Sequence, residues 1–327
     1  MQTKYIGLDA HSSTCTLCVL DSKGREIDNR TIVTNGRLLI NYLQSLGDNI
    51  VLTFEECDLS FWLFDILHKH VREIIVCNPA ANVQYKRAKT DKLDARNLAN
   101  LLRGGYLRPV FHDGSNRERF RILVSGYEDV VQEIVRLRNR LKTTKRQARL
   151  SETKISGDHR TFIREQLSTR LEYLIQTQKE YHKRLEAHAR QFKETKYLIS
   201  IPGIAYIQAA RIIAQVVDPR RFENKYKFFA YCGLVRHPRI SAQRSYGTTR
   251  AWGNRMLKCV FKMAAHSALK GENSLRGYYE SLRNKGLGDK PARNAVARKI
   301  ASLTLSLWKN SQRFNDKEIL KSLPVKV

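Results

Sequence analysis

Apolar and polar positions alternate over the first 110 residues in a pattern that predicts short strands separated by helices. Apolar runs bounded by turn residues predict strands at residues 4–8, 14–20, 26–34, 50–54 and 73–77. Helical spacing predicts helices at residues 37–46 and 61–71, and a third that begins after Thr90 and stops at Gly104-Gly105. The predicted order is therefore β-β-β-α-β-α-β-α.

This order is that of the ribonuclease-H-like α/β fold, a meander of three strands followed by strand–helix–strand crossovers. In that topology the first and fourth strands lie side by side and parallel, and sites form outside the carboxyl ends of the strands. Asp9 and Glu55 stand at the carboxyl ends of the first and fourth predicted strands. We therefore expect their carboxylates to meet at one edge of the sheet.

The rest of the chain is predicted to be helical. Residues 115–195 lack proline, and their apolar positions recur at long helical spacing among many Arg and Lys, which predicts a coiled-coil hairpin with a polar turn near 151–158. Beyond residue 196 the chain is expected to be globular and mostly α, with helices at 207–217, 256–269 and 291–308. The predicted domains are residues 1–110, 111–195 and 196–327.

The charge of the chain indicates its partners. The 327 residues include 59 Lys and Arg against 31 Asp and Glu, a formal net charge of +28. Nucleic acid is the first expected partner, because neutralised phosphates release counterions, and an anionic membrane surface is the second. No apolar run is long enough for a membrane span and no signal peptide is recognisable, so we expect a cytoplasmic protein. Six scattered cysteines, Cys15 and Cys18 among them, are interpreted as reduced thiols rather than a zinc or redox site.

Four carboxylates from three separated segments form the candidate chemical centre. They are Asp9, Glu55, Asp91 and Asp94. Asp91 and Asp94 share a face of one predicted helix, although an acidic helix start would explain them as well. Like charges at one place raise one another's pKa unless a cation holds them. Their convergence would suit Mg²⁺, with Mn²⁺ as the other candidate ion, in a two-metal phosphoryl-transfer site.

Six motifs, in order along nearly the whole chain, resemble those of a known family. They are G-L-D, F-E-E-C, T-D-K-L-D-A, I-P-G-I, Y-C-G-L-V and W-G-N-R-M-L-K. Together they resemble the DEDD transposases of insertion sequences, of the Piv and MooV type (the IS110 family). The resemblance implies a RuvC-like nuclease domain joined by a coiled coil to a second transposase domain, in a prokaryotic protein associated with the nucleoid. It also implies recombination guided by a structured noncoding RNA, the bridge RNA, which pairs with donor and target DNA. A tetramer, as a dimer of dimers, is implied too, with each acidic site completed by a serine from another protomer.

The acidic residues carry over by position. Asp9 matches the first acid of the family pattern, and Asp91 and Asp94 match the last pair. Glu55 matches the second acid, while Glu56 stays open because strand parity does not exclude either neighbour in a sheet covered on both faces.

The family's serine follows G-L-V-P by a few residues and usually precedes glycine. Here the segment is G-L-V-R-H-P-R-I-S-A-Q-R-S-Y-G, so Ser241 is assigned to that role and Ser245 is the alternative. Basic residues around the serine are expected to stabilise charge in the transition state or to hold DNA; they are Arg236, His237, Arg239, Arg244 and Arg250. Gly203, in a turn like that of helix-hairpin-helix modules, is a further candidate phosphate contact.

The predicted function is a metal-dependent DNA recombinase in which Ser241 forms an ester with DNA that a partner strand then displaces. Within enzymes, the alternative is a junction-resolving nuclease of RuvC type that uses water as its nucleophile. Outside enzymes, the alternative is a basic nucleic-acid-binding protein without catalysis, whose activity would survive the loss of Asp9.

Overall fold

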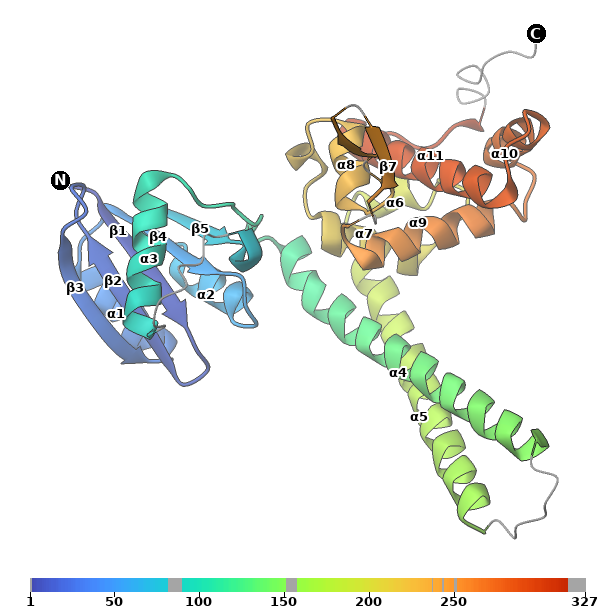
Figure 1. Ribbon diagram of the computed structural model, residues 1–327, viewed down its shortest axis with the longest axis horizontal. Coiled ribbons are helices and arrows are strands. Elements are labelled where there is room, and N and C mark those ends of the chain that lie inside the picture. The colour runs from blue at the N-terminus through green and yellow to red at the C-terminus, as the bar shows by residue number, and fades with distance from the viewer. Residues whose placement is uncertain are drawn as a thin grey trace. The chain divides into compact units, whose positions relative to one another are not determined.

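The computed structural model describes residues 2–81, 90–150, 158–236, 238–242, 244–249 and 252–316. The chain divides into two compact units, Met1–Asn116 and Arg117–Val327 (Figure 1). Within the described ranges, no helix is both long and apolar enough to cross a membrane.

The first unit contains a five-stranded sheet with the order β3-β2-β1-β4-β5. Its strands are β1 (Lys4–Ala10), β2 (Thr14–Leu20), β3 (Glu26–Val33), β4 (Ile50–Glu55) and β5 (Glu73–Cys77). Strand β1 pairs antiparallel with β2 and parallel with β4, so the predicted contact between the first and fourth strands is confirmed.

Helices cover both faces of this sheet (Figure 1). Helices α1 (Gly36–Ser45) and α2 (Ser60–Leu67) pack on the face that carries the larger core, which includes Ile6, Leu8, Leu52 and Phe54. Helix α3 (Asp91–Gly104) packs on the other face, against a smaller cluster. A short 3₁₀ turn, η1 (Pro79–Ala81), follows β5.

Local sequence explains where these helices begin and end. Thr90 Oγ1 accepts the N–H of Leu93, which makes it the N-cap of α3 as predicted, and Gly105 ends the helix at φ +70°. Helix α2 ends at Leu67, before the predicted residue 71. At Arg72 the chain has already joined the sheet, because the backbone N–H of Arg72 donates to Ile50 O in β4.

A glycine allows α3 to approach the sheet closely. A Cβ on Gly7 of β1 would lie 2.1 Å from Ala95 O and 2.4 Å from Ala99 N, both in the backbone of α3. Since no side chain fits there, the backbone of α3 rests directly on β1. This close approach carries the N-terminus of α3 over the end of β1.

The second unit is mostly helical. Its elements are α4 (Asn116–Leu150), α5 (Asp158–Ala189), α6 (Thr195–Leu198), α7 (Tyr206–Val216), η2 (Pro219–Arg221), α8 (Lys225–Tyr231), β6 (Pro238–Ser241), β7 (Arg244–Thr248), α9 (Arg255–Ala268), α10 (Ser274–Asn284) and α11 (Asp289–Asn310). Figure 1 shows α4 and α5 running beside each other away from the globular part, in which α9 and α11 are also visible.

The hairpin of α4 and α5 and the C-terminal helices share one core at the base of the hairpin. Phe120, Val124 and Tyr127 of α4 and Leu185 of α5 belong to the same buried cluster as α7, α9 and α11. Farther out, a small separate cluster around Ile134 holds the two helices together. The two predicted long helices are confirmed, their coiled-coil packing stays a prediction, and most of the predicted turn, residues 151–157, lies outside the described part of the chain.

One segment differs from its sequence-based prediction. The sequence analysis predicted no helix or strand for the basic, serine-rich stretch after Gly233, and the structure has β6 and β7 there as an antiparallel hairpin. Every residue of both strands is exposed. Because neither face packs on a core, the segment lacks the apolar alternation by which a strand is recognised in a sequence.

Candidate functional site

Asp9 and Asp91 meet at the carboxyl end of β1, with His11 between them. His11 Nε2 lies 3.1 Å from Asp9 Oδ2 and 3.8 Å from Asp91 Oδ1. One ligand atom from each of the three residues lies within 4.8 Å of the others, which is close enough for one cation to bind all three. The Asp9 side chain is only 21% exposed, whereas those of His11 and Asp91 are more than half exposed, so the group opens to solvent on one side.

Asp94 and Glu55, the other two predicted carboxylates, lie outside this group of three residues, at adjoining positions. Asp94 lies three residues after Asp91 on α3, and its charge acts on Asp9. In the parallel pairing of β1 with β4, Gly7 is opposite Thr53, so the next residues on the same face are Asp9 and Glu55. Gly7 contacts α3, and this face is therefore the one that α3 covers.

The same register separates Glu55 from Glu56. Glu55 is the last residue of β4 and is partly buried, whereas Glu56 follows the strand, is exposed, and donates its backbone N–H to Cys77 O. With side chains alternating along a strand, Glu55 has the parity of the α3 face and Glu56 has the opposite parity.

Burial and like charges act together on Asp9. Burial raises the pKa of the Asp9 carboxyl above its usual value, the charges of Asp91 and Asp94 raise it further, and His11 acts in the opposite direction. An ionised Asp9 is therefore held in an unfavourable setting, which a cation among these groups would relieve. The donor set, carboxylates with one imidazole, fits a divalent ion.

His11 was not among the residues predicted from the sequence. The sequence feature that could have indicated it is its distance from Asp9 along the chain. The two residues are two apart, next to the end of a strand, and side chains two apart along a strand share a face. The turn after β1 preserves this arrangement, because the backbone N–H of His11 donates to Thr14 O.

Ser241 lies at the tip of the exposed hairpin in the second unit. It is the last residue of β6 and pairs with Arg244 of β7, while Ser245 pairs with Ile240. Ala242, which follows Ser241, has φ +44°, a conformation that favours glycine. Arg239 and Arg244 are exposed on the two strands of this hairpin, and Arg236 is exposed before the first strand. The predicted contacts His237 and Arg250 lie outside the described residues.

Two family models match separate parts of the chain. Residues 6–148 match a model named for the DEDD transposase of IS110 and described as a transposase. Residues 195–280 match a model described as the transposase IS116/IS110/IS902 family, and the two matches together cover more than half of the chain. The chain belongs to this IS110 family of transposases. A curated relative, the insertion element IS116 uncharacterized 44.8 kDa protein of Streptomyces clavuligerus, is 25% identical over 139 residues. That similarity covers 40% of the chain, and the chain spans about a third of the relative's length, 35%.

The two matches of the IS110 family separate the candidate residues as the structure does. The first contains all four predicted carboxylates and His11, and the second contains Gly203 and Ser241. The departure from the family's serine-glycine pattern is at Ala242, whose positive φ is the conformation in which glycine is favoured.

Gly203 has a packing role in the structure. It has φ +90°, and a Cβ there would lie 2.1 Å from Ala264 O in α9. The Pro202-Gly203 turn is thus pressed against the backbone of α9, which accounts for a glycine at this position. Its contact with a DNA phosphate stays a prediction.

The Cys15-x-x-Cys18 pair is divided between the two faces of the sheet. Cys15 packs in the core under α1 and α2, and Cys18 packs in the cluster under α3. Burial raises the pKa of Cys15, and it raises the pKa of Cys18 to about 12. Thiols on opposite faces of a strand cannot bind one ion together, so the pair has a structural role.

Proposed function

We propose that this IS110-family chain is an RNA-guided DNA recombinase that cuts and rejoins strands by metal-dependent transesterification through a serine–DNA ester. One observation carries the proposal. The fold brings Asp9 and Asp91, from a strand and a distant helix, within reach of one cation. An exposed serine on a cationic hairpin accompanies this acidic group in the same chain.

The acidic group would hold the divalent ion through Asp9 and Asp91, with Asp94 and Glu55 at the adjoining positions. A bound divalent cation polarises a phosphate and stabilises the oxygens that attack and leave. Asp9 is anchored on β1, and Asp91 and Asp94 on the first turn of α3, so rigid elements rather than loops position the carboxylates. His11, 3.1 Å from Asp9, orients that carboxylate.

Ser241 would act as the nucleophile. Its Oγ forms a bond to phosphorus, a bridging P–O bond of the DNA breaks, and the hydroxyl that leaves takes up the proton lost by the serine. A hydroxyl of the partner strand then attacks the phosphoserine ester, and Ser241 is released with its proton restored. Because each ester replaces another, the cycle needs no nucleotide hydrolysis.

The surroundings of Ser241 support this role. The hairpin tip is exposed to an approaching strand, and Arg239 and Arg244 can offset the charge that develops on phosphorus. Further exposed side chains on or just after the hairpin are apolar or aromatic, namely Ile240, Tyr246 and Trp252, the last 84% exposed. Aromatic groups of this kind stack on unpaired bases, which suits DNA opened for strand exchange.

Donor DNA, target DNA and a guide RNA are the proposed partners, and a tetramer is the proposed assembly. The net charge of +28 supports large polyanionic partners. With sequence specificity delegated to base pairing with the RNA, the protein has to recognise shape and backbone rather than bases.

Substitution of Ser241 tests the proposal. Wild-type protein incubated with its DNA and RNA and a divalent metal ion should give a covalent protein–DNA adduct on denaturing gels, and Ser241→Ala should give none while binding both nucleic acids. Ser245→Ala is the matched control, since it removes the neighbouring hydroxyl on the same hairpin, and it should keep the adduct.

Other outcomes separate the alternatives. Cleavage without an adduct would favour a nuclease that uses water. Activity that persists in Asp9→Asn and without divalent metal would favour binding without catalysis.

A further inference from the structure

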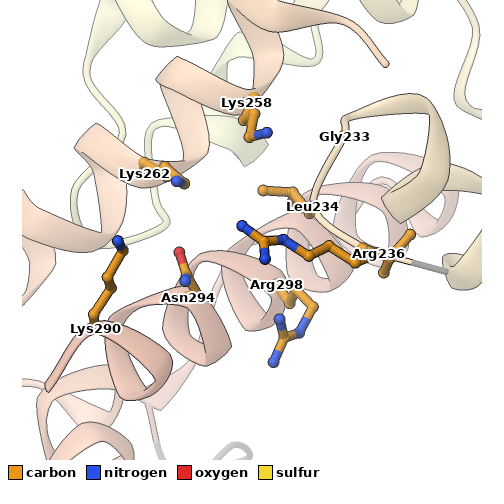
Figure 2. Close-up of a pocket in the computed structure, with 9 residues that line it drawn as sticks. Gly233, Leu234, Arg236, Lys258, Lys262, Lys290, Asn294 and Arg298 are labelled. Atoms are coloured by element: carbon orange, nitrogen blue, oxygen red, sulfur yellow. The ribbon is translucent and has the colours of Figure 1, made fainter. Parts of the chain in front are cut away.

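A pocket in the second unit has a strongly cationic lining. It has a volume of about 390 Å³ and lies between α9, α11 and the loop that follows α8. Its lining residues are Gly233, Leu234, Val235, Arg236, Lys258, Lys262, Lys290, Asn294 and Arg298. Figure 2 shows the Arg236 side chain extending from its loop toward the space between the two helices, where Lys262, Lys290 and Asn294 also end.

The spacing of these cations forms a row on each helix. Lys258 and Lys262 are four residues apart on α9, and Lys290, Asn294 and Arg298 follow one another at four-residue intervals on α11. Lys258 and Lys262 are like charges four residues apart and repel each other. Lys290 and Arg298, eight residues apart with the neutral Asn294 between them, add positive charge on the other side of the pocket. This arrangement therefore opposes folding unless an anion lies between the rows.

The helix dipoles add to this penalty. Lys290 is the second residue of α11 and Lys258 lies in the first turn of α9, where the helix dipole favours negative charge. Cations at the start of two helices, directed into one pocket, indicate selection for binding an anion rather than for stability.

Three cations of the pocket have no carboxylate partner among the described residues. Asp289 precedes Lys290, but its Oδ1 accepts Arg293 Nε at 2.8 Å and the hydroxyl of Tyr279. In the part of the chain that the structure describes, Lys262, Lys290 and Arg298 form no ion pair with a carboxylate. The positive charge is thus available to a ligand.

We propose that this pocket binds a backbone phosphate of the DNA strand that Ser241 attacks, a few nucleotides from the scissile phosphate. This inference rests on the proposed function and adds to it a site that holds the DNA strand in register. A volume within the range of small-ligand pockets, roughly 300–1,000 Å³, accommodates a sugar-phosphate unit. Arginine and lysine side chains donate charge-assisted hydrogen bonds to phosphate oxygens, and here two rigid helices carry most of these side chains.

The pocket and the serine are close along the chain. Arg236 lines the pocket, and Ser241 follows five residues later at the end of β6. Five residues span at most about 18 Å, and phosphates follow one another along a strand at about 3.4 Å of helix rise. A strand held at the pocket can therefore present its scissile phosphate to Ser241 only within a few nucleotides of the bound one. Lys290, Asn294 and Arg298 lie beyond residue 280, outside the segment matched by the family model.

The test compares two pairs of lysines whose replacement removes the same charge. The pocket variant is Lys262→Gln with Lys290→Gln, and the control is Lys270→Gln with Lys285→Gln, two lysines of the same unit outside the pocket. Both are made in full-length protein that also carries Ser241→Ala, so that covalent trapping does not enter. Dissociation constants for a single DNA strand, a DNA duplex and an RNA strand of the same sequence are measured over a series of salt concentrations.

The pocket variant should bind DNA on the order of tenfold more weakly than the control. The magnitude of the slope of log K against log salt should fall by about one, because both lysines face the same phosphate, which then keeps its counterions. Its thermal midpoint should equal or exceed that of the parent, since repulsion is relieved. The charge-preserving variant Lys262→Arg with Lys290→Arg should keep the affinity. Equal affinity in pocket and control variants, or a weakening confined to RNA, would overturn the proposal.

Adduct formation is measured separately, with intact Ser241. If an adduct forms but the pocket variant binds like the control, the pocket assignment fails while the proposed function stands. If the wild type forms no adduct but the pocket variant binds DNA more weakly, the proposed chemistry fails while the pocket stands.

Discussion

At the scale of single residues, Asp9 shows that the acidic group is not organised for stability. Its carboxyl is mostly buried and faces the charges of Asp91 and Asp94, and its pKa is raised. The folded pKa of this carboxyl lies above its unfolded pKa of 3.8. Its contribution to the free energy of unfolding is therefore fully present only below pH 3.8. This stabilisation is lost as the pH rises through the folded pKa. At neutral pH the ionised group therefore opposes folding, as expected of a functional site.

Asp9→Asn should therefore raise the thermal midpoint at neutral pH while it abolishes adduct formation. Asp21→Asn is the matched comparison, because Asp21 accepts backbone N–H groups of Lys23 and Arg25 and the side chain of Arg25, which lower its pKa. That carboxylate stabilises the fold above pH 3.8, so its neutral replacement should lower the midpoint. Calorimetry at about pH 7 and at about pH 3, which is below the unfolded pKa of 3.8, measures both changes. A midpoint lowered by Asp9→Asn would contradict the electrostatic account.

Single residues were also where sequence reasoning reached its limit. The four carboxylates could be predicted because each stands at the end of a recognisable strand or helix. His11 could not be distinguished from a polar residue after a strand until its distances to Asp9 and Asp91 were known. The register between β1 and β4 was needed as well, because strand parity separates Glu55 from Glu56 only once the two faces are identified.

At the scale of elements, the packing of α3 on β1 assembles the acidic group. Asp91 and Asp94 belong to α3 and Asp9 to β1, and the two elements touch backbone to backbone at Gly7. Any side chain at position 7 pushes the helix outward and carries two of the carboxylates away from the third.

Gly7→Ala should therefore weaken metal binding as well as folding. The added Cβ would lie 2.1 Å from Ala95 O, so the backbone has to shift, and overpacking of this kind destabilises a fold by about 1–3 kcal/mol. Titration with Mn²⁺ should show a lower affinity at a temperature where the variant is folded. Gly277→Ala, where a Cβ meets nothing within 4 Å, is the control and should bind Mn²⁺ as the wild type does. Unchanged affinity in Gly7→Ala would show that the helix position does not determine the site.

Most elements of the first unit were predictable, whereas the exposed hairpin of the second unit was not. Most strands and helices of the first unit present an apolar face to a core, so their periodicity is visible in the sequence. The hairpin of β6 and β7 is exposed on both faces, and the pocket between α9 and α11 exists only through helix packing. The cations of α9 and α11 are visible in the sequence, but their convergence on one pocket is not.

At the scale of the whole molecule, the acidic group and the serine hairpin belong to different compact units. The family resemblance implies that a serine of one protomer completes the acidic site of another. In the proposed assembly, each protomer would contribute half of two different sites, and chemistry would require the assembly.

A mixture of Asp9→Asn and Ser241→Ala proteins should therefore regain adduct formation that neither variant has alone. In mixed assemblies some sites combine an intact acidic group with an intact serine, so part of the wild-type yield should return. The adduct should carry only the Asp9→Asn chain, which gel mobility resolves when one variant has a size tag. A mixture as inactive as its components would show that both groups act within one protomer.

The most direct test of the central claim is metal binding by the acidic group. Mn²⁺ bound to the full-length protein is measured by electron paramagnetic resonance for the wild type, for Asp9→Asn and Asp91→Asn, and for the control Asp48→Asn. Asp48 is exposed and precedes β4, at the end of that strand opposite Glu55. The account predicts bound Mn²⁺ in the wild type and in the control. In both site variants the affinity for Mn²⁺ should be lower by roughly tenfold or more. Equal binding by all four proteins would contradict it.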